Sequence, residues 1–450
     1  MAIDIAYIIF LPLAALCFWW LPLRSAILLV LLGGWLLLPV GHWPPGAPGT
    51  GLPWWIVGIA LPSNMLLTKA WIAPLVAFAG AAARGHAPLV RWRPAAIDLP
   101  MALWCLWPFV DGLISPLPAP SPIVAALYVT GAWGLPWLIG RIWFAERGGG
   151  LALTRGLALA GIACLPIAIV EGVHRPMLYG LVYGVHPFRF DGIQRYIGFR
   201  PIGFFEHGNL YGLWTALCAL AAWWLALRPG RRGDRRIWGA VAAGAVAIAI
   251  ASQSAGAIVL LLVGIAIMVM WRRPLVLPVL GGVAGVLVLL VGVHLSGVVP
   301  LQSLARDTAV GREALGALRG VGRGSFAWRI SQDTKTLATV AAAPLQGTAR
   351  WDWWRLYGTR PWGQGLLLIG QFGLIGLTLA WGALLGAAVA GLVRLRRWDD
   401  RLDDGAALPL ALVVLLALAD ALLNAFFFSP AIIAAGAIAA RPSPTRRQSP

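Results

Sequence analysis

The feature that most constrains this chain is a series of apolar runs, each of about 17 to 25 residues, separated by short segments rich in arginine. A run of that length crosses about 30 Å of hydrocarbon as a helix. The runs lack the residue-by-residue alternation of barrel strands, and only helices and closed barrels satisfy the backbone in lipid. Charged residues make up 12% of the chain, against about 25% in soluble domains. We therefore predict an all-α polytopic integral membrane protein with about 12 or 13 transmembrane helices.

The distribution of arginine predicts the topology. The formal net charge is +18, and cytoplasmic loops are the ones that carry excess Lys and Arg. Placing the arginine clusters in the cytoplasm puts two longer polar stretches, Glu171–Asn209 and Leu301–Gln364, together on the outer face. The predicted divisions are N-terminal helices in 1–170, a first outer loop in 171–209, central helices in 210–298, a large outer loop in 299–364, C-terminal helices in 365–440 and a cytoplasmic tail in 441–450.

Arginines in these outer stretches stand on the face that the charge rule disfavours. The planar guanidinium group donates paired hydrogen bonds to phosphate, so a phosphate ligand is one explanation. The candidate residues are Arg195, Arg200, Arg329 and Arg355. The alternative is that the outer arginines pair with neighbouring carboxylates or bind lipid headgroups. Because the basic residues are dispersed among the spans, we expect no nucleic-acid partner.

A few polar residues interrupt the apolar runs themselves. Ser252 and Ser254 form a polar turn that either lines a wet cavity or is a plain hairpin. Asp420 and Asn424 are four residues apart, so they share a helix face, and we expect them to pair within the bundle rather than to catalyse. Lys69 begins its span, and we expect its ammonium group to extend to the membrane surface.

Four segments carry a family resemblance: Arg200–Asn209 (RPIGFFEHGN), Ser252–Ala257 (SQSAGA), Phe326–Ala349 and Gly370–Leu377 (GQFGLIGL). In order, they are similar to an Arg-x-x-Gly-Phe segment with a following Asn, a Ser-x-Ser-Arg-Gly turn, a Trp-Arg…Pro-x-x-Gly-x-Gly pattern and a Glu-x-Gly-Leu-Ile-Gly helix. These motifs belong to the bacterial O-antigen ligase and O-antigen polymerase superfamily, which this chain resembles as a divergent member.

The chain also departs from the family pattern. Ala255, Ala349 and Gln371 stand where the family has Arg, Gly and Glu. Ligases carry a His-Asn pair just before the last of these helices, where this chain has Trp362 and Gly363. The missing histidine favours a polymerase-like member over a ligase.

The resemblance implies a multi-pass glycosyltransferase of the bacterial inner membrane that polymerises or transfers surface polysaccharide on the periplasmic face. Its donor is a glycan linked to polyprenyl diphosphate, which leaves when a sugar hydroxyl attacks the anomeric carbon. Arg200 and Arg329 fall where the family motifs have arginine, and His207 and Glu206 are candidates for the general base. Because arginines would neutralise the diphosphate in place of a metal ion, the reaction is expected to be metal-independent, and no metal or cofactor is expected. Membrane lipid and other polysaccharide-assembly proteins are the implied partners.

Two other functions remain open at this point. One is a transporter or flippase of lipid-linked saccharide, which the scarcity of charge at mid-membrane and the lack of a clear internal repeat disfavour. The other is a non-catalytic component of a polysaccharide export complex.

Overall fold

A computed structural model describes residues 2–41, 58–59, 67–115, 121–184, 186, 193–195, 197–228, 232–271, 306–320, 332–355, 361–397 and 405–439, together with scattered residues of 273–303. The helices in this part of the chain are α1 (Ala2–Trp20), α2 (Leu23–Leu37), α3 (Lys69–Arg84), α4 (His86–Arg91), η2 (Ala96–Asp98), α5 (Leu99–Ile114), α6 (Pro122–Val129), η3 (Thr130–Gly134), α7 (Leu135–Ile139), η4 (Gly140–Phe144), α8 (Gly149–Ile162), α9 (Leu165–His174), α10 (Leu178–Tyr183), α11 (Gly208–Leu227), α12 (Arg232–Ala251), α13 (Ala255–Met270), α16 (Ala309–Gly320), α18 (Leu337–Ala342), α19 (Gln364–Arg397), α20 (Ala407–Ala421) and α21 (Ser429–Ile438).

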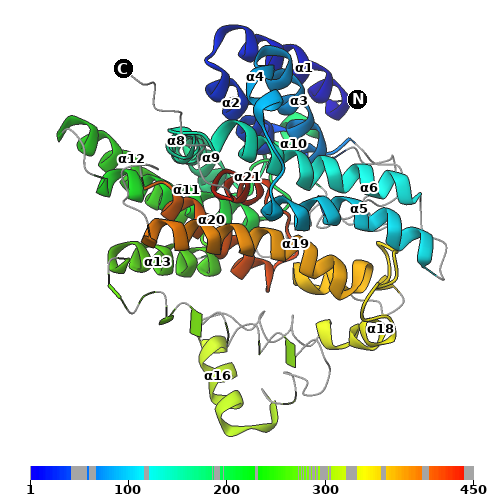
Figure 1. Ribbon diagram of the computed structural model, residues 1–450. Helices are drawn as coiled ribbons and strands as arrows, with labels where there is room; N and C mark the ends of the chain where they lie inside the picture. The colour runs from blue at the N-terminus through cyan, green and yellow to red at the C-terminus, as the bar shows by residue number, and fades with distance from the viewer. Residues whose placement is uncertain are drawn as a thin grey trace.

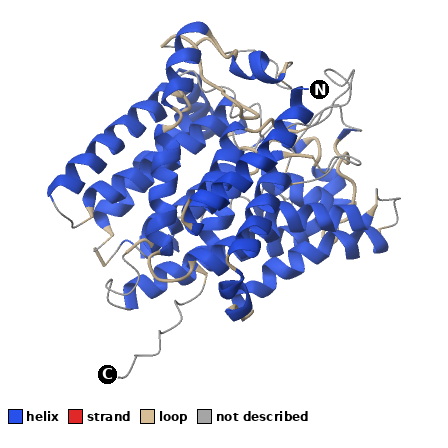
Figure 2. Ribbon diagram, turned by 90° about the horizontal axis from the view of Figure 1, so that it is seen from above, coloured by secondary structure: helices blue, strands red, loops and turns tan. Residues whose placement is uncertain are grey.

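The described residues form no strand, and two isolated bridges, Gly41 to Thr68 and Gln194 to Phe199, are their only extended pairings. Figures 1 and 2 show most of the helices packed side by side in one bundle, and α16 lies apart from it in Figure 1. Six helical stretches are long and apolar enough to cross a membrane, and four shorter helices are also apolar. The all-α membrane class predicted from the sequence is thus confirmed. The number of crossings stays a prediction, since Leu275–Val298 falls mostly outside the described residues.

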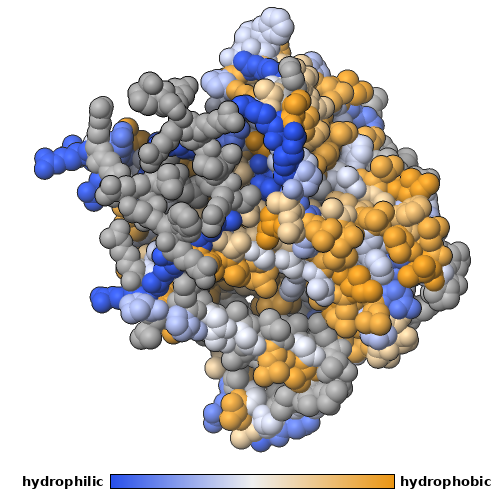
Figure 3. Space-filling view, viewed as in Figure 1, coloured by the Kyte–Doolittle hydropathy of each residue, from blue (hydrophilic) through white to orange (hydrophobic). Residues whose placement is uncertain are grey.

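The surface of the bundle is unusually apolar for a folded protein. Broad hydrophobic areas lie between few hydrophilic residues in Figure 3. Exposed side chains include Ile8 at 65%, Trp19 at 79% and Leu181 at 69% of their accessible area. Large contiguous apolar surface on a soluble monomer would drive association, whereas lipid tails solvate it, so these residues support a membrane-embedded bundle.

The centre of the bundle is filled by α11, α20 and α21, whose side chains are mostly buried. In Figure 1, α21 lies in the middle with helices around it. It crosses the junction of α7 and the π-helical segment η4, and two glycines permit the close approach. A Cβ on Gly140 would overlap the Ile433 carbonyl oxygen, and one on Gly436 would overlap the Trp137 carbonyl oxygen. Small residues let membrane helices approach closely, which compensates for the missing hydrophobic drive inside lipid.

Helix α19 is not the single continuous span that its apolar run predicts. Gly373 has φ 68° and ψ −175° in the middle of it, so the helix is broken there. The chain before α19 fills the break: the amides of Leu374 and Ile375 donate to the carbonyls of Pro344 and Leu345, at 2.8 and 3.1 Å.

On the other side of the break, Thr348 N donates to Gly370 O at 3.1 Å and Ala349 N to Gln371 O at 2.8 Å. Both halves of the helix therefore have their free backbone groups satisfied, as burial in a bundle requires. We call the docked segment Pro344–Ala349 together with Gly370–Ile375 the α19 seam.

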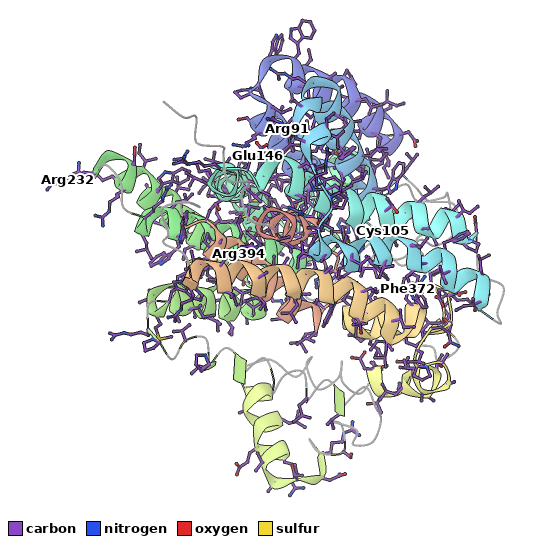
Figure 4. All side chains as sticks on the ribbon, in the orientation of Figure 1. Arg91, Cys105, Glu146, Arg232, Phe372 and Arg394 are labelled. Atoms are coloured by element: carbon purple, nitrogen blue, oxygen red, sulfur yellow. The ribbon has the colours of Figure 1, made fainter. Side chains whose placement is uncertain are left out.

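The two ends of the bundle differ in character. In Figure 4, Arg232 at the start of α12 and Arg394 near the end of α19 lie toward the left, and Phe372 at the break in α19 lies toward the right. The orientation of the bundle in the membrane stays a prediction.

Candidate functional site

The loop that joins α9 to α11 is organised by one buried carboxylate, Glu171. Its Oε1 accepts hydrogen bonds from the amides of Met177 and Leu178 at 3.1 and 3.0 Å. Its Oε2 accepts from those of Ile202 and Gly203 at 2.8 and 2.7 Å. A buried polar group needs hydrogen-bond partners, and these four amides supply them. Glu171 therefore fixes the path of the Arg-Pro-Ile-Gly-Phe segment.

Glu206, a predicted general base, forms a buried ion pair with Lys69. Their side-chain atoms lie 3.3 Å apart, and both residues are almost completely shielded from solvent. Lys69 Nζ also donates to Phe204 O at 3.0 Å and lies 5.0 and 4.9 Å from the ring centres of Trp35 and Phe205. Burial raises the pKa of the Glu206 carboxyl, and the charge of Lys69 opposes that rise.

The expectation that Lys69 extends to the membrane surface is wrong. The lysine points into the bundle instead, because Glu206 and two aromatic faces give it a partner there.

Arg200 is one end of a hydrogen-bonded chain of four side chains. Its guanidinium donates to Asn209 Oδ1, and Asn209 Nδ2 donates to Asn424 Oδ1 at 3.1 Å. Asn424 Nδ2 then donates to Asp420 Oδ1 at 2.9 Å. Arg200 and Asp420 are buried, while the two asparagines are partly exposed. This polar chain links the loop before α11 to the end of α20 and pairs Asp420 with Asn424. The two residues do not share a helix face as their spacing predicted, because α20 ends at Ala421 and Asn424 lies beyond it.

His207, the other predicted base, caps the start of α11. Its Nδ1 accepts a hydrogen bond from Asn209 N at 2.9 Å, and its ring stacks on Phe426 with centres 5.2 Å apart. A neutral imidazole whose Nδ1 accepts a bond carries its proton on Nε2. In this arrangement His207 offers a donor at Nε2. It lies two residues from Asn209, at the partly exposed side of the polar chain.

The second polar stretch reaches the same place through its last residue. Gln364 N donates to Asn424 O at 3.3 Å, and Gln364 Nε2 donates to Phe426 O at 3.4 Å. The two polar stretches, far apart in sequence, therefore meet around Asn424.

The loop also buries His186, which the sequence gives no reason to single out. Its Nε2 lies 3.0 Å from Phe205 O, and its ring makes an edge contact with Tyr179 at 4.5 Å. Burial lowers the pKa of His186 to about 4, so the folded loop holds this histidine neutral at physiological pH.

The polar turn of Ser252 and Ser254 packs on α11 rather than lining a water-filled space. Ser252 Oγ donates to Ala249 O at 2.6 Å, and Ser254 lies against Gly212. Between them, Gln253 Nε2 donates to Ile197 O at 2.8 Å, and Ile197 N donates to Gln253 Oε1 at 3.1 Å. The turn thus holds the first polar stretch in place, which corresponds to the hairpin alternative with an added loop contact.

Two of the remaining predicted arginines, Arg195 and Arg355, lie on the surface. Arg195 is exposed on the loop. Arg355 is also exposed and lies over the rings of Trp351 and Trp354 at 4.6 and 5.9 Å. Arg329 lies outside the described residues. Within the described part, no group of three or more His, Cys, Asp or Glu side chains could hold a metal ion.

Sequence reasoning missed the partners more than the residues. Arg200 and His207 both contact Asn209, whereas the pairing of Glu206 with Lys69 has no local signal. One clue was available: Lys69 is one of only two lysines in the chain, and it stands at the start of an apolar run. The roles of Gln364 and Asn209 follow only from the meeting of the two polar stretches.

Comparison with known proteins assigns no family. No protein-family model matches this sequence, and no curated protein is significantly similar to it.

Proposed function

We propose that this protein is a membrane glycosyltransferase that acts on a polyprenyl-diphosphate-linked glycan, polymerising or transferring surface polysaccharide on the periplasmic face of a bacterial inner membrane. The observation that supports it most is the polar chain from Arg200 to Asp420, which meets both polar stretches at one partly exposed place. A guanidinium held by neighbours is suited to a diphosphate leaving group, because pre-positioned cations stabilise the charge that develops on it.

In this proposal Arg200 binds the diphosphate, and its orientation comes from the chain behind it. Asn209 accepts a hydrogen bond from the guanidinium group, and this contact orients the planar group. The guanidinium also lies against Gly208, where a Cβ would collide with it. A side chain larger than glycine at 208 would therefore displace Arg200.

His207 is better placed to donate a hydrogen bond than to act as a base. Because Nδ1 accepts a hydrogen bond from the backbone amide of Asn209, the neutral ring carries its N–H at Nε2. His207 thus adds a second hydrogen-bond donor to the one that Arg200 provides. Glu206 is shielded by Lys69 and its aromatic neighbours, so we assign it to the support of the loop.

The experiment is a chromosomal deletion in the native host, followed by analysis of surface glycan length and of lipid-linked intermediates. Accumulated single repeat units are the result expected for a polymerase. Full-length polymer retained on its lipid would identify a ligase. The proposal is refuted if the deletion causes no accumulation of lipid-linked intermediates and no loss of surface polymer.

A matched pair of variants tests the site itself. Arg200→Lys keeps the charge and loses the fork, so we expect surface polymer to fall by at least tenfold, since a charge-assisted hydrogen bond contributes roughly 1.5–3 kcal/mol. Arg306→Lys makes the same change at an exposed arginine just before α16 and should leave the amount of surface polymer unchanged. Equal activity in both variants, at normal protein level, would remove Arg200 from the site.

One observation favours the second candidate, a flippase of lipid-linked saccharide. Discontinuous helices are frequent at the substrate sites of transporters, and α19 is broken at Gly373. A flippase deletion would leave lipid-linked precursor on the cytoplasmic leaflet, which the same lipid analysis distinguishes by its accessibility to an added glycosidase in inverted vesicles.

A further inference from the structure

The carboxylate of Asp111 has no use in the proposed function and no partner among the described residues. Asp111 lies in α5, is completely shielded from solvent, and neither of its side-chain oxygens accepts a hydrogen bond there. An ionised carboxylate buried without a donor is strongly unfavourable, so such a group either holds a proton or is compensated by a bound cation.

The opposite end of the same helix shows what a satisfied carboxylate looks like in this bundle. Asp98 receives two hydrogen bonds from Arg141 at 2.6 and 3.0 Å, one from Trp137 at 2.9 Å and one from Ala95 N at 2.9 Å. Asp98 thus has a charge partner and a full set of donors. Asp111 has neither, although it is buried at least as deeply.

The neighbours of Asp111 on its helix face contact the α19 seam. Residues four apart lie on the same face of a helix. One turn before Asp111, Trp107 Nε1 donates to Phe372 O at 2.8 Å; one turn after it, Ser115 Oγ donates to Thr348 O at 3.2 Å. Figure 4 shows the two elements running side by side, with Cys105 of α5 and Phe372 of α19 on the same side of the molecule. Asp111 therefore faces the seam between two backbone carbonyls.

Four amides of the seam are already engaged. Those of Thr348, Ala349, Leu374 and Ile375 bond across the break itself. The seam therefore offers carbonyl oxygens to Asp111. Their second lone pair can accept a hydrogen bond from a protonated carboxyl group or coordinate a cation.

Among the described residues, no charged side chain bonds to the carboxylate. Helix α6, which packs on α5 through Pro122 and Gly112, carries no charged residue. In the seam and just beyond it, Arg350 and Asp352 bond to each other at 3.0 Å. The other titratable group on α5 is the Cys105 thiol.

We propose that the junction of α5 with the α19 seam is a binding site for a small monovalent cation, a proton or Na⁺, with the Asp111 carboxylate as its anionic ligand. Carboxylates beside the carbonyls of a discontinuous membrane helix provide the hard oxygen ligands that such ions take. Because the seam is where the end of the second polar stretch docks, occupancy of the site stabilises the docked segment.

The test is infrared spectroscopy of the purified protein in detergent at neutral pH, first with choline as the added cation and then with Na⁺. Without Na⁺ we expect the C=O stretch of a protonated carboxylic acid, and this band should disappear in Asp111→Asn. Asp352→Asn, which removes a partly exposed, paired carboxylate, should retain it. If Asp111→Asn does not fold, Asp111→Glu keeps the carboxyl group and should shift the band.

The response to Na⁺ identifies the ligand. Loss of the band together with a higher unfolding temperature of the wild-type protein assigns the site to Na⁺, and an unchanged band assigns it to the proton. The proposal is overturned if no carboxylic-acid band depends on Asp111 and the wild-type unfolding temperature is the same in choline and Na⁺. Neither readout requires glycosyl transfer, so failure here is distinct from failure of the proposed function.

Discussion

The two polar stretches differ in how their charged groups are held. In Glu171–Asn209 three described charged residues are buried and bonded: Glu171 to four amides, Glu206 to Lys69 and Arg200 to Asn209. The other two described arginines of this stretch, Arg175 and Arg195, are exposed. In Leu301–Gln364 the described arginines are exposed or half-exposed.

This difference changes how the outer arginines should be interpreted. A buried polar group must be satisfied, so its partners fix its position. An exposed arginine retains its hydration and contributes little to the fold. The arginines of the two stretches are therefore not a single functional set, and the comparison between the stretches can be tested residue by residue.

The largest effect should come from the buried pair in the first stretch. Lys69→Met leaves the Glu206 carboxylate without its cation in a dry site, so we expect a loss of about 3–5 kcal/mol in the free energy of unfolding. The check is denaturant unfolding in detergent. The double variant Lys69→Met/Glu206→Leu should regain most of the loss. A stable Lys69→Met single variant would show that the first stretch does not depend on its buried charges.

His186 gives the first stretch a pH dependence. Its pKa is about 4 in the folded protein and about 6.5 when unfolded, so protonation favours the unfolded chain. The stabilising effect of the neutral ring is fully present above about pH 6.5 and is lost as the pH falls toward 4, by up to about 3 kcal/mol. Unfolding of the wild type and of His186→Gln across this range should converge at low pH. Parallel pH profiles would contradict the assignment.

Asp420 tests the link between the stretches. Asp420→Ala removes the acceptor of Asn424, and we expect a loss of about 1–3 kcal/mol. The yield of folded protein should then fall more than the polymer made per folded molecule. Asp420→Asn keeps one acceptor oxygen and should be milder. Normal yield with abolished activity would instead give Asp420 a direct part in the chemistry.

The smallest effect should be in the second stretch. Arg355→Lys keeps the charge and loses the planar contact with the Trp351 ring, so the change in stability should stay below about 1 kcal/mol. Thermal unfolding measures it. A drop in surface polymer without a change in stability would show that Arg355 serves the substrate, as its position in the sequence suggested.

The helices could be predicted from the sequence because apolar run length is a local property. The run Ile5–Leu21 corresponds to α1 (Ala2–Trp20), and Ile237–Ala251 lies within α12 (Arg232–Ala251). The break at Gly373 could not be predicted in the same way. Its apolar run is uninterrupted, and the backbone groups that fill the break come from Pro344–Ala349.

The candidate site was predicted in part for the same reason. The motif around Arg200, Glu206 and His207 is local, so the sequence identified its members. Whether a carboxylate is a base or an ion-pair partner depends on what lies opposite, and Lys69 reaches Glu206 from another helix. Likewise, His207 Nδ1 accepts a hydrogen bond because this residue caps α11. The cap therefore decides which ring nitrogen can donate a hydrogen bond.

The position of α21 has a consequence for biogenesis. This helix is ten residues long and entirely buried in the middle of the bundle, yet it is synthesised after the helices that enclose it. During translation the earlier helices must therefore remain in the membrane around an unfilled centre until α21 threads between them, with Gly140 and Gly436 giving it room to pass close. Release from the insertion machinery and escape from membrane proteases then become late events, controlled by the arrival of Ser429–Ile438 rather than by the first spans to enter the lipid.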